Sequence, residues 1–156
     1  MVITLYVGAD HGGFAIKAEI LELLKKAGYQ AIDCGAYTLD PTDDYPQYAF
    51  SVAQKVASEN EQGADARGIL LCRSGIGVAI AANKVRGIRA ATVHSVADAH
   101  VAREHTGITV LALASDQLTT EQAWSIINEF LVTAVSSEER HQRRIANITR
   151  FEKESV

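Results

Sequence analysis

The chain has 156 residues, 47% hydrophobic and 22% charged, with a formal net charge of −4 at pH 7. That is the size of one domain with one core, and its acidic balance argues against a nucleic-acid partner. We find no membrane span, no signal-peptide start, and only two cysteines, in no zinc-ligand spacing, so we expect a reduced, cytoplasmic protein without structural zinc.

The apolar pattern predicts strands that alternate with helices. In chain order we expect a strand at 3–9, a helix at 12–28, a strand at 29–35, a helix near Pro46, a strand at 66–72, a helix at 77–85, a strand at 88–93, a helix around 96–105, a strand at 108–113, a helix at 119–135 and a polar helix at roughly 137–153. Pro46 suits a first helical turn, and Thr119 with Gln122 forms a capping-box pattern.

This alternation predicts an α/β protein. We expect a Rossmann-like three-layer α/β/α fold with a five-stranded parallel sheet and an extra C-terminal helix. No linker or internal repeat interrupts the chain, so we interpret 1–156 as a single domain. Ligands of such sheets bind at the carboxyl ends of the strands, and this rule selects Asp10–His11, the turn CRSGIG at 72–77 and the segment near His105.

The turn CRSGIG follows a predicted buried strand directly. Cys72 is either a small buried hydrophobe, the common state of a free cysteine, or a reactive thiol, since turn N–H groups and Arg73 stabilise an anion there. Ser74 is a plausible N-cap for the helix that follows. The turn matches neither a Walker A loop nor GxGxxG, so it does not indicate a nucleotide site.

The other polar groups have both a structural and a functional interpretation. Asp10 could cap a helix, while His11 is placed to meet an anion, and His105 could simply complement a helix dipole. Arg140 and Arg144 share one helical face, which is either solvated or a clamp for a phosphate dianion. Together the groups suit proton transfer next to a carbonyl in a small phosphorylated substrate, without a metal or another cofactor.

The ordered segments GADHGGF, DDYPQYA, GILLCRSGIGVAIAANKVRGIRA, REH, VLA and RHQRRI resemble the ribose-5-phosphate isomerase B family, which includes galactose-6-phosphate isomerase subunits. The resemblance runs from residue 3 to about 150. It implies an aldose–ketose isomerase that works through a cis-enediol, with ribose 5-phosphate and ribulose 5-phosphate as the default pair. Alternatives are erythrose 4-phosphate/erythrulose 4-phosphate, allose 6-phosphate or galactose 6-phosphate, or a non-catalytic sugar-phosphate sensor.

The same resemblance implies residue roles by position. The implied catalytic residues are Cys72, Ser74, His105 and Asp10. Cys72 would be the base that moves the proton between C1 and C2, and Ser74 with the backbone of Gly75 to Gly77 would stabilise the enediolate. His105 would open the sugar ring, and Asp10 with Tyr45 would line the sugar hydroxyls. The phosphate-binding set is matched by His11, Arg140 and Arg144. The family forms dimers or tetramers with shared active sites, so we expect a homodimer or homotetramer in which the helix at 137–153 packs on a neighbouring subunit.

Three departures from the family pattern border the expected site. Arg73 stands where a glycine is usual, Thr106 where an asparagine is usual, and Ala114-Ser115-Asp116 in place of Gly-x-Arg. We include Arg73 and Thr106 among the expected substrate contacts. Our hypothesis is that Arg73 narrows the pocket or adds a contact, which would favour a four-carbon aldose phosphate.

Overall fold

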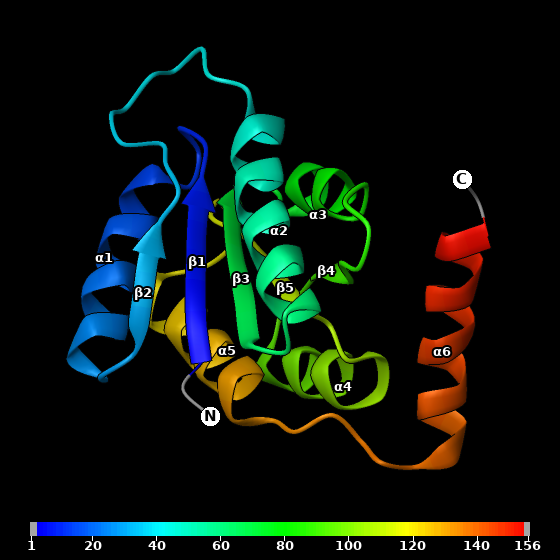
Figure 1. The fold of residues 1–156 in the computed structure, drawn as a ribbon. Coiled ribbons are helices and arrows are strands. Elements are labelled where there is room, and N and C mark those ends of the chain that lie inside the picture. Colours follow the sequence, from blue (N-terminus) through cyan, green and yellow to red (C-terminus); the bar gives the residue numbers. More distant parts are fainter. Residues whose placement is uncertain (1–2, 155–156) are drawn as a thin grey trace.

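The computed structural model describes residues 3–154 and contains one parallel sheet with helices on both faces (Figure 1). The elements in chain order are β1 (Ile3–Ala9), α1 (Phe14–Lys26), β2 (Gln30–Asp33), α2 (Tyr45–Glu61), β3 (Asp65–Cys72), α3 (Ile76–Ala82), β4 (Ala90–Thr92), α4 (Val96–Thr106), β5 (Val110–Ala114), α5 (Thr120–Val132) and α6 (Glu139–Glu154). The strand order is β2-β1-β3-β5-β4, and every neighbouring pair is parallel. The predicted α/β fold, with five parallel strands and an extra C-terminal helix, is confirmed.

Alternation along β3 divides its side chains between the two halves of the core. Ile69 and Leu71 pack on the face covered by α1, α4 and α5, whereas Leu70 and Cys72 pack on the face covered by α2 and α3. A one-residue slip would move each side chain to the opposite face. Both sets are buried, so each face of β3 contributes to the core, at about 1.5–3 kcal/mol for each fully buried leucine or isoleucine.

The starts of α2 and α5 follow from local sequence signals. The Thr119–Gln122 capping box is present in full, and Pro46 lies in the first turn of α2. The prediction that Ser74 caps α3 is wrong: the cap is Gly75, which is in the left-handed conformation, and the Ser74 hydroxyl instead accepts a hydrogen bond from the Ile76 amide at 3.3 Å.

The elements around β4 are shorter than predicted. α3 ends at Ala82 instead of 85, and β4 covers only Ala90–Thr92 instead of 88–93. The side chain of Asn83 explains both limits, because its amide donates to the carbonyl oxygens of Ala79 and Ala90 and its oxygen accepts from the Ala90 amide. Asn83 thereby closes the helix and fixes the entry to the strand.

Helix α6 stands apart from the sheet, beside the end of α4 (Figure 1). His141 is its one buried side chain among the described residues, and the large apolar side chains of Ile148 and Phe151 are exposed. A helix with this much exposed apolar surface is typical of an interface. No helix in the described part of the chain is long and apolar enough to cross a membrane.

Candidate active site

A cleft of about 480 Å³ lies at the carboxyl edge of the sheet, beyond the ends of β1 and β3. It is lined by Asp10, His11, Tyr45, Cys72, Arg73, Ser74, Ile76, Gly77 and Ile80. We call it the thiol cleft. The parallel register explains the meeting of its two central groups: Ala9 pairs with Leu71, so the residues that follow, Asp10 and Cys72, emerge side by side.

The thiol of Cys72 is held by the turn that follows it. The side chain is buried, and Sγ accepts a hydrogen bond from the Gly75 amide at 3.1 Å. A thiolate, the form of cysteine that accepts a proton from carbon, would receive the same hydrogen bond. The structure therefore supports Cys72 both as a packed residue and as a group with access to the cleft.

Two glycines allow the walls of the thiol cleft to approach one another. Gly75 has φ of 72°, and a Cβ there would lie 2.9 Å from Cγ2 of Thr92. A Cβ on Gly77 would lie 2.6 Å from the ring of Tyr45. Both positions thus need glycine for geometric reasons. The close packing alone explains why glycine stands there, so it is no evidence that the two amides contact a ligand.

Asp10 is buried and organises the backbone at the start of α1. Its Oδ1 accepts from the amides of Gly12 at 2.9 Å and Gly13 at 3.2 Å. The interpretation of Asp10 as the helix cap is wrong, because the N-cap of α1 is Gly13 and Asp10 instead braces the turn before it. The same side chain also lines the thiol cleft beside Cys72, so these hydrogen bonds hold a carboxylate next to the thiol.

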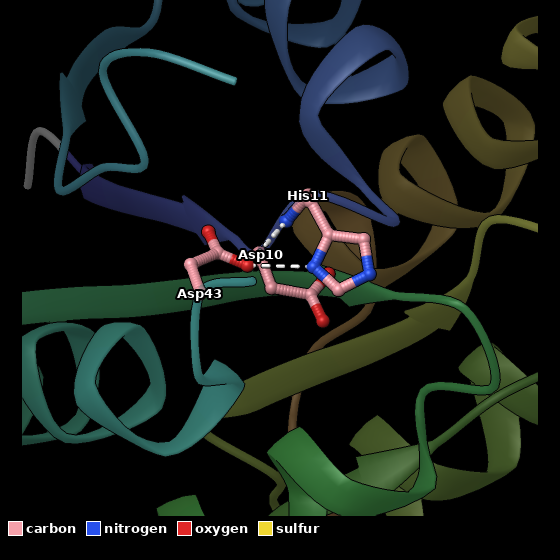
Figure 2. Close-up of side chains that lie close together, drawn as sticks. All are labelled: Asp10, His11 and Asp43. Atoms are coloured by element: carbon pink, nitrogen blue, oxygen red, sulfur yellow. Dashed lines mark hydrogen bonds and ion pairs between the residues drawn. The ribbon is translucent and has the colours of Figure 1, made fainter. Parts of the chain in front are cut away.

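His11 is held by a carboxylate that the sequence analysis missed. Asp43 accepts at Oδ1 from the His11 backbone amide at 3.0 Å and lies 2.6 Å from Nδ1 of the ring (Figure 2). Burial alone would raise the pKa of Asp43, but hydrogen bonds from His11 and Tyr48 lower it below its usual value. The available signal was the motif DDYP, which places Asp43 two residues before Tyr45.

The ligand atoms of Asp10, His11 and Asp43 lie within 4.8 Å of one another, a spacing that a metal ion could bridge. These atoms also make the internal hydrogen bonds described above, which account for their grouping without a metal. The expectation of a metal-free site stays a prediction.

Arg73 lies at the rim of the thiol cleft and pairs with another departure from the family pattern. Its Nη1 is 3.6 Å from Oδ2 of Asp116, and the Asp116 amide donates to the Arg73 carbonyl at 3.1 Å. Both side chains are more than half exposed, so the ion pair contributes little stability, about 0–1 kcal/mol. The Arg73 guanidinium is thus only weakly held by Asp116, and its place at the rim leaves it free to turn toward a ligand in the thiol cleft.

His105 lies at the opposite edge of the sheet from Cys72. Helix α4 runs back from the end of β4 to the start of β5, where Val110 pairs with Gly68, four residues before Cys72. In Figure 1 α4 accordingly lies toward the other end of the strands from α3. The expectation that His105 faces the carboxyl edge within its own chain is wrong, because the end of a returning helix lies at the amino edge.

A second polar group surrounds His105, and we call it the His–Arg cluster: His105, His141, Arg140 and Arg144. The rings of His105 and His141 stack with centroids 4.2 Å apart and an interplanar angle of 10°. Burial, followed by the nearby His105 and Arg140, lowers the pKa of His141. His141 was not among the predicted site residues, although it stands inside the motif RHQRR.

The arginines of this cluster are exposed near the start of α6. Nε of Arg140 forms an ion pair with Oε2 of Glu138 at 2.8 Å, and Arg144 follows one turn later. Thr106, the neighbour of His105, is also exposed, and its hydroxyl donates to the Ala102 carbonyl at 2.6 Å. None of these three residues lines the thiol cleft, so one chain keeps the two groups of predicted site residues apart.

Comparisons with known proteins agree with this fold. The model of the family described as Ribose/Galactose Isomerase matches residues 5–148. A ribose-5-phosphate isomerase B from Mycobacterium leprae is 40% identical, over 96% of this chain and 90% of its own. The crystal structure of ribose-5-phosphate isomerase B from Mycoplasma genitalium with bound ribulose-5-phosphate has a TM-score of 0.92 and 41% identity, over 99% of both chains. A type B ribose 5-phosphate isomerase from Trypanosoma cruzi has the same TM-score at 36% identity, over 100% of both chains.

Proposed function

Since this chain belongs to the ribose/galactose isomerase family and is an aldose–ketose isomerase, we propose that it interconverts ribose 5-phosphate and ribulose 5-phosphate with Cys72 as the base. The observation that carries the proposal is the position of the Cys72 thiol, at a strand end beside Asp10 in the thiol cleft. The relatives named for ribose 5-phosphate and the neighbour that binds ribulose-5-phosphate support this substrate pair.

The reaction needs only proton transfers. The Cys72 thiolate takes the proton from C2 of the open-chain aldose, a double bond forms between C1 and C2, and the carbonyl electrons move to O1, which takes up a proton. The proton on O2 then leaves as the C2 carbonyl forms, and the Cys72 thiol returns a proton to C1. The carbon skeleton is neither oxidised nor reduced overall, so the chemistry requires no redox cofactor.

The turn after Cys72 supplies donors for the negative charge on the enediolate. The Gly75 amide is used by Sγ and the Ile76 amide by the Ser74 oxygen. We therefore assign the charge to the Ser74 hydroxyl, whose own hydrogen can donate, and to the Gly77 amide. Asp10 and Tyr45 line the cleft where the sugar hydroxyls would lie.

We further propose that the complete active site forms between two copies of the chain. The thiol cleft contains the base, whereas the groups proposed to open the sugar ring and bind its phosphate lie at the opposite edge of the sheet. A second copy can place its His–Arg cluster against the thiol cleft of the first. The exposed apolar side chains of α6 are consistent with this interface.

One observation favours a second substrate. Arg73 lies on the rim of the thiol cleft, where the family pattern has no side chain, and a smaller cleft would suit erythrose 4-phosphate. The carbon count of the substrate is therefore the point on which the two candidates differ.

A panel of phosphorylated aldoses and ketoses with four to six carbons tests the proposed function. We expect the highest kcat/KM with ribose 5-phosphate, together with exchange of the C2 proton with solvent. A higher kcat/KM with erythrose 4-phosphate would favour the four-carbon substrate, and no turnover of any member would contradict the proposal. Activity should survive EDTA; loss that a divalent ion restores would contradict the metal-free mechanism.

A further inference from the structure

We propose that Asp43 is a positioning residue, which fixes the ring of His11 so that Nε2 faces the thiol cleft and meets the phosphate of the substrate. The inference rests on the proposed function in one respect, namely that His11 is a phosphate contact. It adds a buried carboxylate, from the loop between β2 and α2, to the groups on which binding depends.

Asp43 contacts His11 at two points. A single oxygen, Oδ1 of Asp43, engages both the backbone amide of His11 at 3.0 Å and Nδ1 of its ring at 2.6 Å. Two contacts to one residue fix the backbone and the ring plane together. A carboxylate is an acceptor only, so the hydrogen of this contact belongs to Nδ1. The tautomer of His11 is thereby determined.

The contact with Asp43 leaves Nε2 as the ring nitrogen of His11 that can meet a ligand. Figure 2 shows Nε2 on the far side of the ring from Asp43, and His11 lines the thiol cleft. Phosphate oxygens are acceptors, so a contact with Nε2 requires a hydrogen there as well. With phosphate bound, His11 would then donate through both nitrogens, one to Asp43 and one to the phosphate.

The Asp43 carboxylate is buried beside a partly accessible ring. The Asp43 side chain is 3% exposed and that of His11 is 25% exposed, so the carboxylate is shielded from solvent whereas part of the ring can be reached by a ligand. The pKa of Asp43 is lowered, so the carboxyl is ionised at neutral pH. A buried charge of this kind needs its donors, and removing it leaves the His11 ring without the contact that holds it.

The loop that presents Asp43 is internally braced. Oδ1 of Asp40 accepts from the Thr42 amide at 2.9 Å and from the Thr42 hydroxyl at 2.7 Å, and the Asp43 amide donates to the Asp40 carbonyl. Two residues later the chain reaches Tyr45 on another wall of the thiol cleft. The loop therefore sets the positions of two residues of the thiol cleft: His11, through Asp43, and Tyr45, which directly follows the loop.

The test combines two variants with a matched control. Asp43→Ala removes the acceptor, Asp43→Asn keeps an acceptor oxygen but loses the charge, and Asp44→Ala removes the adjacent exposed carboxylate. Long-range ¹H–¹⁵N NMR reports which ring nitrogens of His11 carry hydrogen. Inhibition by inorganic phosphate reports the phosphate contact, and kcat and KM are measured separately.

We expect the hydrogen of wild-type His11 on Nδ1, and a change of tautomer in Asp43→Ala. The inhibition constant of inorganic phosphate and the KM should rise about tenfold in Asp43→Ala, as for loss of a charge-assisted hydrogen bond, with a smaller change in kcat. Asp43→Asn should lie between the wild type and Asp43→Ala, and Asp44→Ala should match the wild type.

A wild-type His11 protonated on Nε2 alone would overturn the proposal, and this measurement needs no variant to fold. Unchanged phosphate inhibition in folded Asp43→Ala or Asp43→Asn would overturn it too. The tautomer is measured without turnover. An enzyme that converts no sugar phosphate would therefore contradict the proposed function while leaving the NMR result to decide the role of Asp43.

Discussion

The thiol cleft and the His–Arg cluster are built in different ways. The thiol cleft draws its charged groups and its thiol from strand ends and the turns after them, and backbone amides hold its buried Asp10 and Cys72. The His–Arg cluster lies on two helices, and its arginines are exposed on α6. The cleft is therefore organised within one chain, whereas the cluster has the character of a surface that meets a partner.

The difference shows how a parallel sheet distributes a catalytic site. Register brings Asp10 and Cys72 together, because their strands are neighbours that end at the same edge. The same topology sends the end of α4, with His105, to the other edge. An active site that needs both ends must use two copies of the chain, as we propose.

The largest effect should come from the thiol cleft. Cys72→Ala should lower kcat by about 10²–10⁴-fold and abolish exchange of the C2 proton, because the variant lacks the base. Binding of inorganic phosphate should persist. Cys34→Ala is the matched control, since Cys34 is also buried and free but lies outside the lining of the cleft, and it should retain activity. Full activity in Cys72→Ala would contradict the assignment of Cys72 as the base.

The His–Arg cluster should affect a different step. His105→Ala should lower kcat/KM for ribose 5-phosphate by about 10²-fold, because its furanose ring must open first. Ribulose 5-phosphate has no free hydroxyl that can close a furanose ring, so exchange of its C1 proton with solvent should persist. Equal losses in both assays would show that His105 does not act in ring opening.

Loss of the proposed clamp should appear mainly in KM. Arg140→Ala and Arg144→Ala should each raise KM about tenfold, as for loss of one charge-assisted contact to phosphate. Arg143→Ala is the control, because it removes an equally exposed, ion-paired arginine of the same segment that is not in the predicted phosphate-binding set. If all three variants behaved alike, the effect would be one of net charge and the clamp would be refuted.

The smallest effect is expected at the rim of the thiol cleft. Arg73→Gly removes a side chain that is 67% exposed and only weakly paired with Asp116, so stability should hardly change. We expect a few-fold shift in kcat/KM toward longer substrates, because the cleft becomes wider. An unchanged order of preference among four-, five- and six-carbon substrates would exclude Arg73 from substrate selection.

The fold was largely predictable because it depends on local signals. Apolar runs mark the strands, and signals such as the Thr119–Gln122 capping box mark helix starts. The limits of β4 were not predictable, since the side chain of Asn83 sets them through contacts on both sides of the connection. Such contacts leave no periodic pattern in a sequence.

The candidate site was predictable only in part. Residues at the ends of β1 and β3 could be grouped because strand ends share an edge. The roles of Asp43 and His141 depend on contacts with His11 and His105, each distant in the sequence, and no spacing rule predicts them. The position of His105 was mistaken because the rule for strand ends was applied to a residue at the end of a returning helix, which lies at the other edge of the sheet.

Complementation between two inactive variants tests the shared site most directly. Cys72→Ala and His105→Ala chains with different tags would be co-expressed, and oligomers that carry both tags isolated. A dimer of this kind has one site with both substitutions and one with neither, so it should regain about half of the wild-type activity on ribose 5-phosphate. Mixed oligomers no more active than either parent would contradict a site built from two chains.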